Sequence, residues 1–342
     1  MSREAIGRLN EALARFPRVG LCTLPTPFEP MMRLSRHLAG PRLWVKREDC
    51  SGPGFGGNKL RKLDYVLHDA LQSGVDTLVS GGVVQSNSQR QVAAAAAKLG
   101  LDCHLAVYHG RHAPPSPDYG RTGNALLNRL FGATLHDVPW NGDRNGAIRD
   151  LAARLQAEGH KTYVVPYGVS NALGAAGYAS TVAEIAEQCA TRDITPRAIV
   201  HCSGSAATQA GLVVGARLCL PDTRIIGIDI DAEPERVRAD VLAHGRGAAL
   251  LLDQPFDEHD VEVVAGHAGP AYGVPHAATI EAIGLAARLE ALILDPVYSG
   301  KGLAGLIALI WTGRWSADDD IVFLHTGGAP ALFAYRHLFD PE

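Results

Sequence analysis

Residues 75–108 read VDTLVSGGVVQSNSQRQVAAAAAKLGLDCHLAVY, and this stretch decides the fold class. It begins with a β-rich run at residues 75–79 and continues into an alanine-rich segment at 85–99, which is typical of a close-packed helix. A second β-rich run follows at 104–108. A strand, a helix and another strand in this order predict a βα unit whose strands run parallel.

The same alternation continues along the chain. Further β-rich runs lie at residues 134–138, 162–165, 198–201, 225–228 and 321–324. Further amphipathic, helix-like runs lie at residues 123–130, 148–157, 175–189, 206–219 and 331–338. Repeated units of this kind imply mainly parallel, twisted sheets with helices on both faces, so we expect an α/β protein.

Bulk composition narrows the class of protein. A chain of 342 residues that is 46% hydrophobic can bury a large core and is long enough for two domains. The net charge of −4 and the absence of a basic block argue against a nucleic-acid-binding role. The first residues lack the segments of a signal peptide, and the apolar run at 303–311 is too short to span a bilayer.

Cysteine and histidine usage points to a reduced, metal-free protein. The six cysteines form no Cys-x-x-Cys pair, which favours free thiols in a cytoplasmic protein. The 14 histidines show no metal-ligand spacing, so we expect no metal site.

The chemically most informative residue is Lys59, within GGNKLRK at residues 56–62. A glycine turn delivers this lysine to the start of a helix-like segment. The positive helix N-terminus and apolar surroundings disfavour the ammonium form and free the amine to form a Schiff base. Taken alone, the same pattern also fits a solvated lysine after a glycine turn.

Residues 52–57, GPGFGG, formally match a dinucleotide-binding pattern. A nicotinamide site needs that turn between a strand and its crossover helix, with an acidic residue at the end of the second strand. Here Asp76 begins the next β-rich run and Pro53 stiffens the loop, so we expect no nicotinamide cofactor.

Residues 203–208, SGSAAT, lie between a β-rich run and a helix-like one. Small residues, hydroxyls and a helix N-terminus together can bind a phosphate, although the ending of a nucleotide-binding P-loop is missing. An ordinary capped turn is the alternative. A second polar cluster, QSNSQRQ at 85–91, follows the strand at the edge where open α/β sheets bind ligands. Capping of the next helix by Ser86 or Asn87 is compatible with ligand contact.

Three further polar positions are flanked by glycine or lie in a turn: Tyr272, Thr326 and the segment 295–302, DPVYSGKG. Each alone is typical of a turn. Together with the two polar clusters and Lys59, they indicate a site for a phosphate-bearing aldehyde cofactor.

The chain resembles the D-cysteine desulfhydrase and 1-aminocyclopropane-1-carboxylate deaminase family, within the tryptophan-synthase-β-like pyridoxal-phosphate enzymes. The resemblance runs from Leu24 to Gly328. The motifs that carry it are residues 46–49 (KRED), 56–59 (GGNK), 85–87 (QSN), 170–174 (SNALG), 203–205 (SGS) and 295–298 (DPVY).

The resemblance implies roles for the cofactor-binding residues. Lys59 would carry pyridoxal 5'-phosphate as a Schiff base, and Asn58 would contact the cofactor hydroxyl. Thr326 would face the pyridine nitrogen, with Ser299 as the other hydroxyl available to it. The cofactor phosphate would be bound by Ser203, Gly204, Ser205, Ala206, Ala207 and Thr208.

The resemblance also implies roles on the substrate side. Ser86 and Asn87 would hold the carboxylate of a small amino acid, and Ser86 could join proton transfer; Gln85 and Ser88 flank them. Tyr272 and Tyr298 would line the substrate side and act as acids or orient the amine.

A smaller domain at residues 62–168, inserted into a larger one made of 1–61 and 169–342, is implied as well. So is a homodimer.

Three positions depart from the family pattern. Ring-opening deaminases have a glutamate where this chain has Ser299, and a hydroxyl there supports a weaker electron sink. Ser88 replaces the histidine or glutamine expected beside the substrate, and Ala207 replaces a glycine of the phosphate loop. Ser299 favours β-elimination over ring opening.

The resulting hypothesis is a pyridoxal-phosphate dependent β-eliminating lyase that converts D-cysteine to pyruvate, ammonia and sulfide. The alternatives are an L-cysteate sulfo-lyase, a 1-aminocyclopropane-1-carboxylate deaminase, a β-replacement synthase and a non-catalytic ligand-binding protein.

Overall fold

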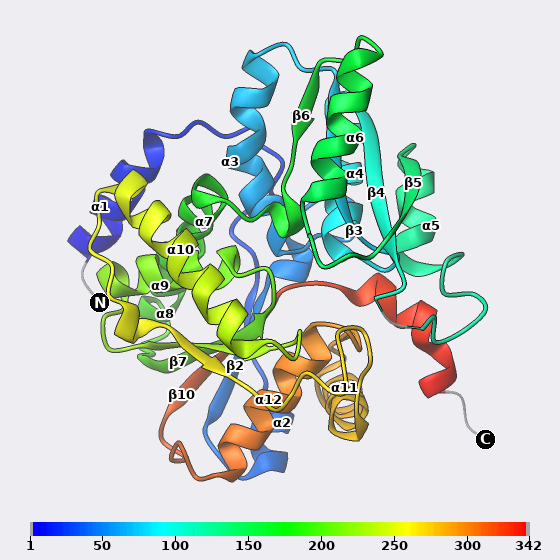
Figure 1. The fold of residues 1–342 in the computed structure, drawn as a ribbon. Coiled ribbons are helices and arrows are strands. Elements are labelled where there is room, and N and C mark those ends of the chain that lie inside the picture. Colours follow the sequence, from blue (N-terminus) through cyan, green and yellow to red (C-terminus); the bar gives the residue numbers. More distant parts are fainter. Residues whose placement is uncertain (1–2, 112, 340–342) are drawn as a thin grey trace.

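The computed structural model describes residues 3–111 and 113–339, and these form two β-sheets with helices packed around each (Figure 1). One sheet has six strands and the other has four. Nine of the ten strands pair in parallel, since β1 alone runs antiparallel to its neighbour β2. The predicted α/β class with mainly parallel sheets is therefore confirmed.

The six-stranded sheet combines the two ends of the chain. Its strands, in spatial order, are β1 (Phe28–Pro30), β2 (Arg42–Arg47), β10 (Asp320–His325), β7 (Pro196–Ser203), β8 (Arg224–Asp229) and β9 (Glu262–Val264). Strand β7 shows why the sheet is covered on both faces. Ile199 packs into one hydrophobic cluster, whereas Ala198 and Val200 pack into another. Because successive strand residues point to opposite faces, a continuous apolar run buries both sides.

Helices from separate parts of the chain cover the two faces of this sheet. The first cluster contains residues of α1 (Arg3–Ala14), α7 (Ala172–Tyr178), α8 (Ser180–Ala190), α9 (Ala207–Cys219) and α10 (Pro234–Leu252). The second contains residues of α2 (Met32–Leu38), α11 (Ala277–Glu290) and α12 (Ser299–Trp311).

The four-stranded sheet comes from the middle of the chain. Its order is β5 (Thr134–Pro139), β4 (Asp102–His109), β3 (Thr77–Val83) and β6 (Thr162–Val164). Helices α3 (Asn58–Gln72) and α4 (Asn87–Leu99) share one of its hydrophobic clusters, and α6 (Gly146–Ala157) contributes to another. Helix α5 (Gly123–Leu130) packs beside α4. The quoted stretch 75–108 forms β3, α4 and β4, as predicted.

The chain passes between the two sheets at two points, and a hydrogen bond joins those points. Lys62, in the first turns of α3, donates from Nζ to the carbonyl oxygen of Gly168 at 2.7 Å, across 106 residues of sequence. Gly168 lies in the short 3₁₀ helix η2 (Tyr167–Val169). All four strands of the smaller sheet lie within residues 62–168, and the domain boundaries drawn there stay a prediction.

Two of the predicted helices differ in the structure. The run at 175–189 forms α7 and α8, because the backbone N–H of Ala179 is shared between the carbonyls of Ala175 and Ala176 and tightens the chain there. The run at 331–338 forms a 3₁₀ helix, η4 (Ala329–Leu338), interrupted at Tyr335. The Tyr335 hydroxyl donates to the carbonyl of Gly273 at 2.7 Å and anchors the turn. The two remaining 3₁₀ helices are η1 (Glu48–Cys50) and η3 (Glu258–Asp260).

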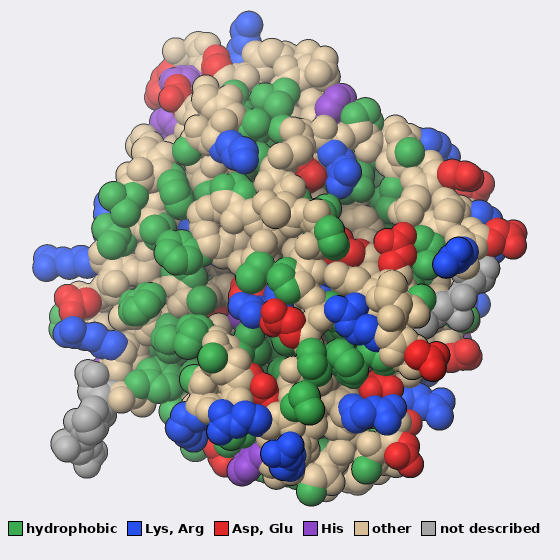
Figure 2. Space-filling model, turned by 180° about the vertical axis from the view of Figure 1, so that it is seen from behind, with side chains coloured by type: hydrophobic (Ala, Val, Ile, Leu, Met, Phe, Trp, Pro, Cys, Tyr) green, Lys and Arg blue, Asp and Glu red, His purple; other side chains and the backbone are tan. Residues whose placement is uncertain are grey.

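The surface carries both signs of charge. Figure 2 shows basic and acidic side chains interspersed over one face of the molecule, with hydrophobic side chains gathered toward the left of that view. Within residues 3–111 and 113–339, no helix combines the length and hydrophobicity needed to cross a bilayer. The same residues contain no group of three or more side chains placed to hold a metal ion.

Candidate active site

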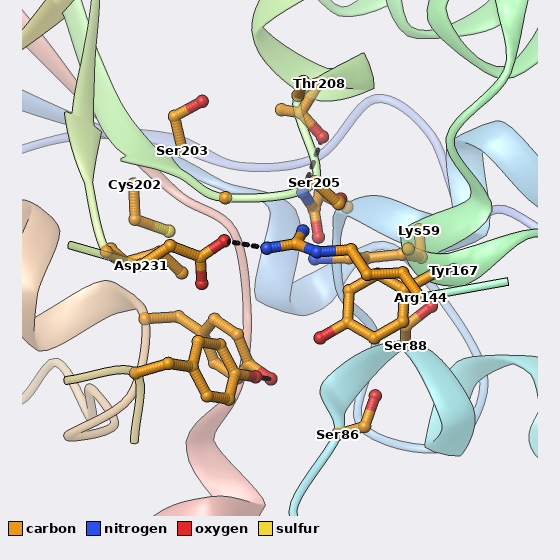
Figure 3. Close-up of a pocket in the computed structure, with 17 residues that line it drawn as sticks. Lys59, Ser86, Ser88, Arg144, Tyr167, Cys202, Ser203, Ser205, Thr208 and Asp231 are labelled. Carbon is orange, nitrogen blue, oxygen red and sulfur yellow. Dashed lines mark hydrogen bonds and ion pairs between the residues drawn. The ribbon is translucent and has the colours of Figure 1, made fainter. Parts of the chain in front are cut away.

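A pocket lies where the two sheets face each other, and it collects residues from both. Helices α3 and α4 contribute their first turns, β7 and the start of α9 form another wall, and the segments after β5 and β8 complete it (Figure 3). The lining residues predicted from the sequence are Asn58, Lys59, Ser86, Ser88, Ser203, Gly204, Ser205, Ala206, Thr208, Tyr272 and Tyr298. Segments far apart in sequence are thus brought to one site.

Lys59 reaches the pocket because two glycines allow a tight approach of the backbone. A Cβ atom at Gly56 would lie 2.1 Å from the carbonyl oxygen of Asp49, and one at Gly57 would lie 2.5 Å from Gln91 Nε2. Gly57 also has φ of 122°, which side chains rarely tolerate. The turn therefore requires glycine at both positions, and it starts α3 so that Lys59 falls in the first turn.

The amine of Lys59 is weakly basic for a lysine. Desolvation lowers its pKa to about 8, an effect that Cys202 and Asp295 partly oppose. Its Nζ lies 5.6 Å from the ring centroid of Tyr298, and no ion pair of Lys59 occurs in the described part of the chain. A substantial fraction of this amine is neutral near pH 8, which suits a nucleophile or a base.

The segment 203–208 forms a concave turn into α9. Ala206, the residue before the helix, has φ of 72° and gives α9 no side-chain cap. Ser203 Oγ is buried and has no hydrogen-bond partner among the described residues. Gly168 allows close approach from the other side, since a Cβ there would lie 2.2 Å from Ser205 Oγ. An uncapped helix N-terminus beside an unpaired buried hydroxyl suits a phosphate.

Asn58 links Lys59 to this turn. Its Nδ2 donates to Thr208 Oγ1 at 2.8 Å, while its buried Oδ1 has no partner within residues 3–111 and 113–339. The free oxygen can therefore accept a hydrogen bond from a bound hydroxyl.

The first turn of α4 forms the opposite wall. Ser86 caps the helix by accepting from the N–H of Gln89 at 3.2 Å. Asn87 Nδ2 and Ser88 Oγ are buried and, in the part of the chain that the structure describes, unpaired. Capping and ligand contact are compatible here, as the sequence indicated, because two donors beside the cap stay available.

Tyr272 and Tyr298 form a pair whose hydroxyls are hydrogen-bonded to each other. Burial raises the pKa of each phenol well above its ordinary value, so both hydroxyls stay protonated at neutral pH. The pair can hold a proton or donate one into the pocket.

Five of the predicted site residues lie outside the pocket lining. They are Gln85, Asn87, Ala207, Ser299 and Thr326. Gln85 donates to the carbonyls of Tyr119 and Thr122 and thereby fixes the loop before α5. Ser299 donates from Oγ to Asp295 Oδ1 at 2.6 Å and accepts from the N–H of Asp295. Their roles toward ligands stay predictions.

Thr326 does not line the pocket itself but contacts a residue that does. Its Oγ1 lies 3.1 Å from the Sγ of Cys202, which lines the pocket. Burial raises the pKa of the Cys202 thiol to about 11, so this thiol is neutral.

Sequence reasoning missed several lining residues, which are Arg144, Tyr167, Gly168, Cys202, Ile230 and Asp231. Arg144 and Asp231 form a 2.6 Å ion pair between segments 87 residues apart. In Figure 3 this pair crosses the pocket between Ser203 and Thr208 on one side and Ser86 on the other. The position of Asp231 just after a strand of a parallel sheet was the one signal available in the sequence.

The chain belongs to the family of pyridoxal-phosphate dependent enzymes, whose family model matches residues 20–327. It is 43% identical to a D-cysteine desulfhydrase of Yersinia enterocolitica over 328 residues, which cover 96% of this chain and 98% of that protein. It is also 43% identical to a D-cysteine desulfhydrase of Salmonella newport over 326 residues, covering 95% and 98%.

Among solved structures, an ACC deaminase homologue superposes with a TM-score of 0.87 at 32% identity, and the match covers 99% of each chain. The predicted family, the fold and the dependence on pyridoxal phosphate are therefore confirmed.

The residues present fit this cofactor. The turn 203–208 with the uncapped start of α9 suits its phosphate, and Asn58 Oδ1 is a free acceptor for its hydroxyl. Lys59 is a weakly basic amine suited to its aldehyde. Two buried polar atoms without a partner among the described residues, Asn58 Oδ1 and Ser203 Oγ, would thus gain partners from the cofactor.

Proposed function

We propose that this chain is a β-eliminating lyase that acts on a small amino acid with a sulfur leaving group. D-cysteine is the proposed substrate, and the products are pyruvate, ammonia and sulfide. The observation that carries the proposal is Lys59, a weakly basic amine placed between a phosphate-binding turn and a pair of protonated tyrosines. The D-cysteine desulfhydrases of similar sequence support it.

The substrate carboxylate is held by the first turn of α4. Ser86, Asn87 and Ser88 supply donors there, and two of them, Asn87 Nδ2 and Ser88 Oγ, have no other partner among the described residues. A carboxylate accepts hydrogen bonds from such donors, and their burial strengthens the interaction. This contact orients the substrate amine toward Lys59.

Proton transfer falls to Lys59 and the tyrosine pair. When bound, pyridoxal phosphate supplies a conjugated ring that withdraws electrons from the substrate α-carbon. The neutral Nζ of Lys59 accepts the α-proton. The C–S bond then breaks, its electron pair leaves with sulfur, and Tyr272 or Tyr298 holds a proton for the departing group. One water completes the balance by releasing ammonia and pyruvate.

The cofactor contacts form part of the same proposal. Ser203 to Thr208 hold the phosphate, and Asn58 Oδ1 accepts from the ring hydroxyl. Thr326 faces the ring nitrogen, supported by its contact with the pocket-lining Cys202. The Ser299 hydroxyl donates a hydrogen bond to Asp295. Ser299 therefore affects the cofactor through that buried carboxylate.

Other reactions of the same site are separated by their products. Sulfite release from cysteate identifies a sulfo-lyase, and 2-oxobutanoate from the cyclopropane substrate identifies a deaminase. A requirement for a second, nucleophilic substrate identifies a β-replacement synthase.

We also propose a cytoplasmic homodimer. An apolar surface pocket near the C-terminal part of the chain supports the dimer, since its lining includes the exposed side chains of Ile293, Phe333 and Phe339. Light scattering of the purified protein measures the oligomeric state.

The deciding assay measures pyruvate and sulfide together, with D-cysteine and L-cysteine in parallel. We expect matched release from the D isomer and a loss of roughly a thousandfold in the Lys59→Ala variant, because nucleophile and base are both removed. Lys98→Ala, at an exposed position of α4, is the control and keeps full activity. Retention of turnover in Lys59→Ala would overturn the proposal.

A further inference from the structure

The two paired tyrosines of the pocket come from separate segments of the chain. Tyr298 is the residue before α12, and Tyr272 lies in a short turn between Ala271 and Val274, which form an isolated β-bridge. The two hydroxyls are hydrogen-bonded to each other although 26 residues separate them in the sequence. The geometry of the pair therefore depends on what joins this turn to the start of α12.

Lys301, a buried residue in the first turn of α12, makes that connection. Its Nζ donates to the carbonyl oxygen of Ala268 and, at 3.2 Å, to that of Ala271, the residue before Tyr272. It also lies 3.5 Å from the carbonyl oxygen of Ile230, which follows β8 and lines the pocket. One ammonium group thus joins the helix behind Tyr298, the segment that carries Tyr272 and a wall of the site.

The surroundings of the Lys301 amine are those of a bound cation. Its three acceptors are all backbone carbonyl oxygens, which we call the carbonyl cage. Burial lowers the pKa of Lys301 to about 8, an effect that Asp231, Asp295 and Asp229 partly oppose, so the amine is mostly charged at pH 7. An ammonium group has three N–H donors, enough for three carbonyls, and its removal takes a donor from each of them.

We propose that Lys301 is a positioning residue for the tyrosine pair, and that its ammonium group acts as a cation built into the carbonyl cage. It holds Tyr272 against Tyr298 so that one of their hydroxyls can give its proton to the departing sulfur. The inference rests on the proposed β-elimination, in which the pair holds that proton.

The proton and electron balance of this step is complete. The C–S bond breaks with its electron pair on sulfur, and the tyrosine proton forms the new S–H bond. The tyrosine is then reprotonated through solvent by the proton that Lys59 took from the α-carbon. No further co-reactant is needed.

The first test compares two leaving groups in the holoenzyme. Sulfide is basic and needs a proton as it leaves, whereas chloride from β-chloroalanine leaves without one. We expect Lys301→Ala to lower kcat for cysteine by roughly a hundredfold with little change in KM, because the proton donor is displaced. Turnover of β-chloroalanine of the same configuration should change little. Equal losses with both substrates would overturn the proposal.

The second test returns a cation to the carbonyl cage. Lys301→Ala leaves space beside the three carbonyl oxygens, and potassium ions bind such oxygens. We expect potassium chloride, but not choline chloride, to restore much of the cysteine turnover and to raise the melting temperature of the variant. The absence of both effects would overturn the proposal.

Lys62→Ala is the matched control for this rescue. Lys62 is also a buried lysine, but its Nζ has a single carbonyl acceptor, that of Gly168. Potassium should therefore neither raise its melting temperature above the value in choline nor change its turnover. An equal rescue of Lys62→Ala would mean that potassium acts generally and would overturn the proposal.

The wild-type protein gives a measurement that does not depend on how a variant folds. Because its cation is built in, cysteine turnover should be equal in potassium and in choline buffers of the same ionic strength; a requirement for potassium would overturn the inference. If Lys301→Ala does not fold, Lys301→Gln, which keeps N–H donors without the charge, takes its place in the comparison of leaving groups.

The melting temperature separates this inference from the proposed function. Absence of pyruvate from both substrates in the wild type would refute the lyase. A potassium-dependent rise in the melting temperature of Lys301→Ala would still support the carbonyl cage. Normal turnover by the wild type without any such rise in the variant would leave the lyase in place and refute the cage.

Discussion

Two buried clusters of basic side chains and carboxylates differ in their relation to the pocket that contains Lys59. In the inner cluster, Lys46 and Arg61 pair with Glu48 and Glu184, two cations with two anions. Arg61 holds both oxygens of Glu48, at 2.7 and 2.8 Å. Arg61 Nε and Nη2 donate to Glu48, Glu184 and Thr26, while its Nη1 has no hydrogen-bond partner among the described residues. These bonds join α3 to segments far away in the sequence.

The cluster around Asp231 differs in its number of partners and in its position beside the pocket. Three guanidiniums share one buried carboxylate, and two of its members, Arg144 and Asp231, line the pocket. No member of the inner cluster lines it. The comparison teaches that one buried ion network holds the segments around α3 together, whereas the other forms part of the wall of the candidate active site.

The largest effect on stability is expected from breaking the balanced cluster. Glu48→Gln removes the charge that pairs with Arg61 and leaves a fully buried guanidinium underpaired. We expect the free energy of unfolding to fall by about 3–5 kcal/mol, measured by urea denaturation. Glu29→Gln is the control, because Glu29 is 49% exposed and pairs with Arg47 at the surface; it costs less than about 1 kcal/mol. Equal losses would contradict the distinction.

A smaller loss of stability is expected from the cluster around Asp231. Asp231→Asn removes the shared carboxylate, but Arg236 keeps Glu233 and Asp240. We expect the free energy of unfolding to fall by about 1–3 kcal/mol, measured by urea denaturation, because Arg111 and Arg144 each lose a carboxylate partner. Asp240→Asn is the control, because Asp240 is 43% exposed; it costs less than about 1 kcal/mol. An equal loss in Asp231→Asn and Asp240→Asn would contradict the importance of burial for this cluster.

A third effect, visible only as a dependence of stability on pH, concerns Lys59, which belongs to neither cluster. Its pKa of about 8 in the folded protein is below that of an unfolded lysine, near 10.4. Above about pH 10.4 the amine is neutral in both states and does not alter stability. As pH falls from there to 8, the unfolded state gains the proton first, so Lys59 destabilises the fold progressively.

Reductive methylation of the cofactor-free protein measures this directly. The rate at Lys59, followed by peptide mapping, should rise with pH around a midpoint near 8. N-acetyl-lysine ethyl ester in the same tube gives the methylation rate of a lysine amine whose pKa is not shifted. A midpoint for Lys59 equal to that of the free amine would show that desolvation does not act on it.

Much of the fold and part of the site could be predicted from the sequence. The apolar run that became β7 and the alanines of α4 have local patterns that specify strand and helix. Lys59 and Ser203 could be predicted because each belongs to a glycine-containing turn with a recognisable chemistry. Such local signals survive in the sequence because the backbone itself requires them.

The rest depends on contacts that no local pattern encodes. Arg144 and Asp231 lie on separate loops, 87 residues apart, and only the arrangement of the two sheets brings them together. The KRED motif at 46–49 shows that a recognisable motif need not contain ligand-binding residues. Its residues identify the family, yet the side chains of Lys46 and Glu48 point into the protein, to Glu184 and Arg61. A motif reports that residues matter without reporting whether they bind a ligand.

The hydrogen bond from Lys62 to Gly168 has a consequence for how such a chain can change over evolution. The bond holds residues 62 and 168 together, and these are the points where the chain leaves the six-stranded sheet and comes back to it. The segment between them, which forms the four-stranded sheet, therefore starts and ends at the same place, although the two residues are 106 positions apart. Loop-closure entropy depends only weakly on the length between two joined points. The segment between residues 62 and 168 can therefore be lengthened, shortened or exchanged while the strand order of the six-stranded sheet stays as it is. Because this segment carries Ser86, Ser88 and Arg144 of the pocket, exchanging it would change one wall of the site while leaving Lys59 and the 203–208 turn in place.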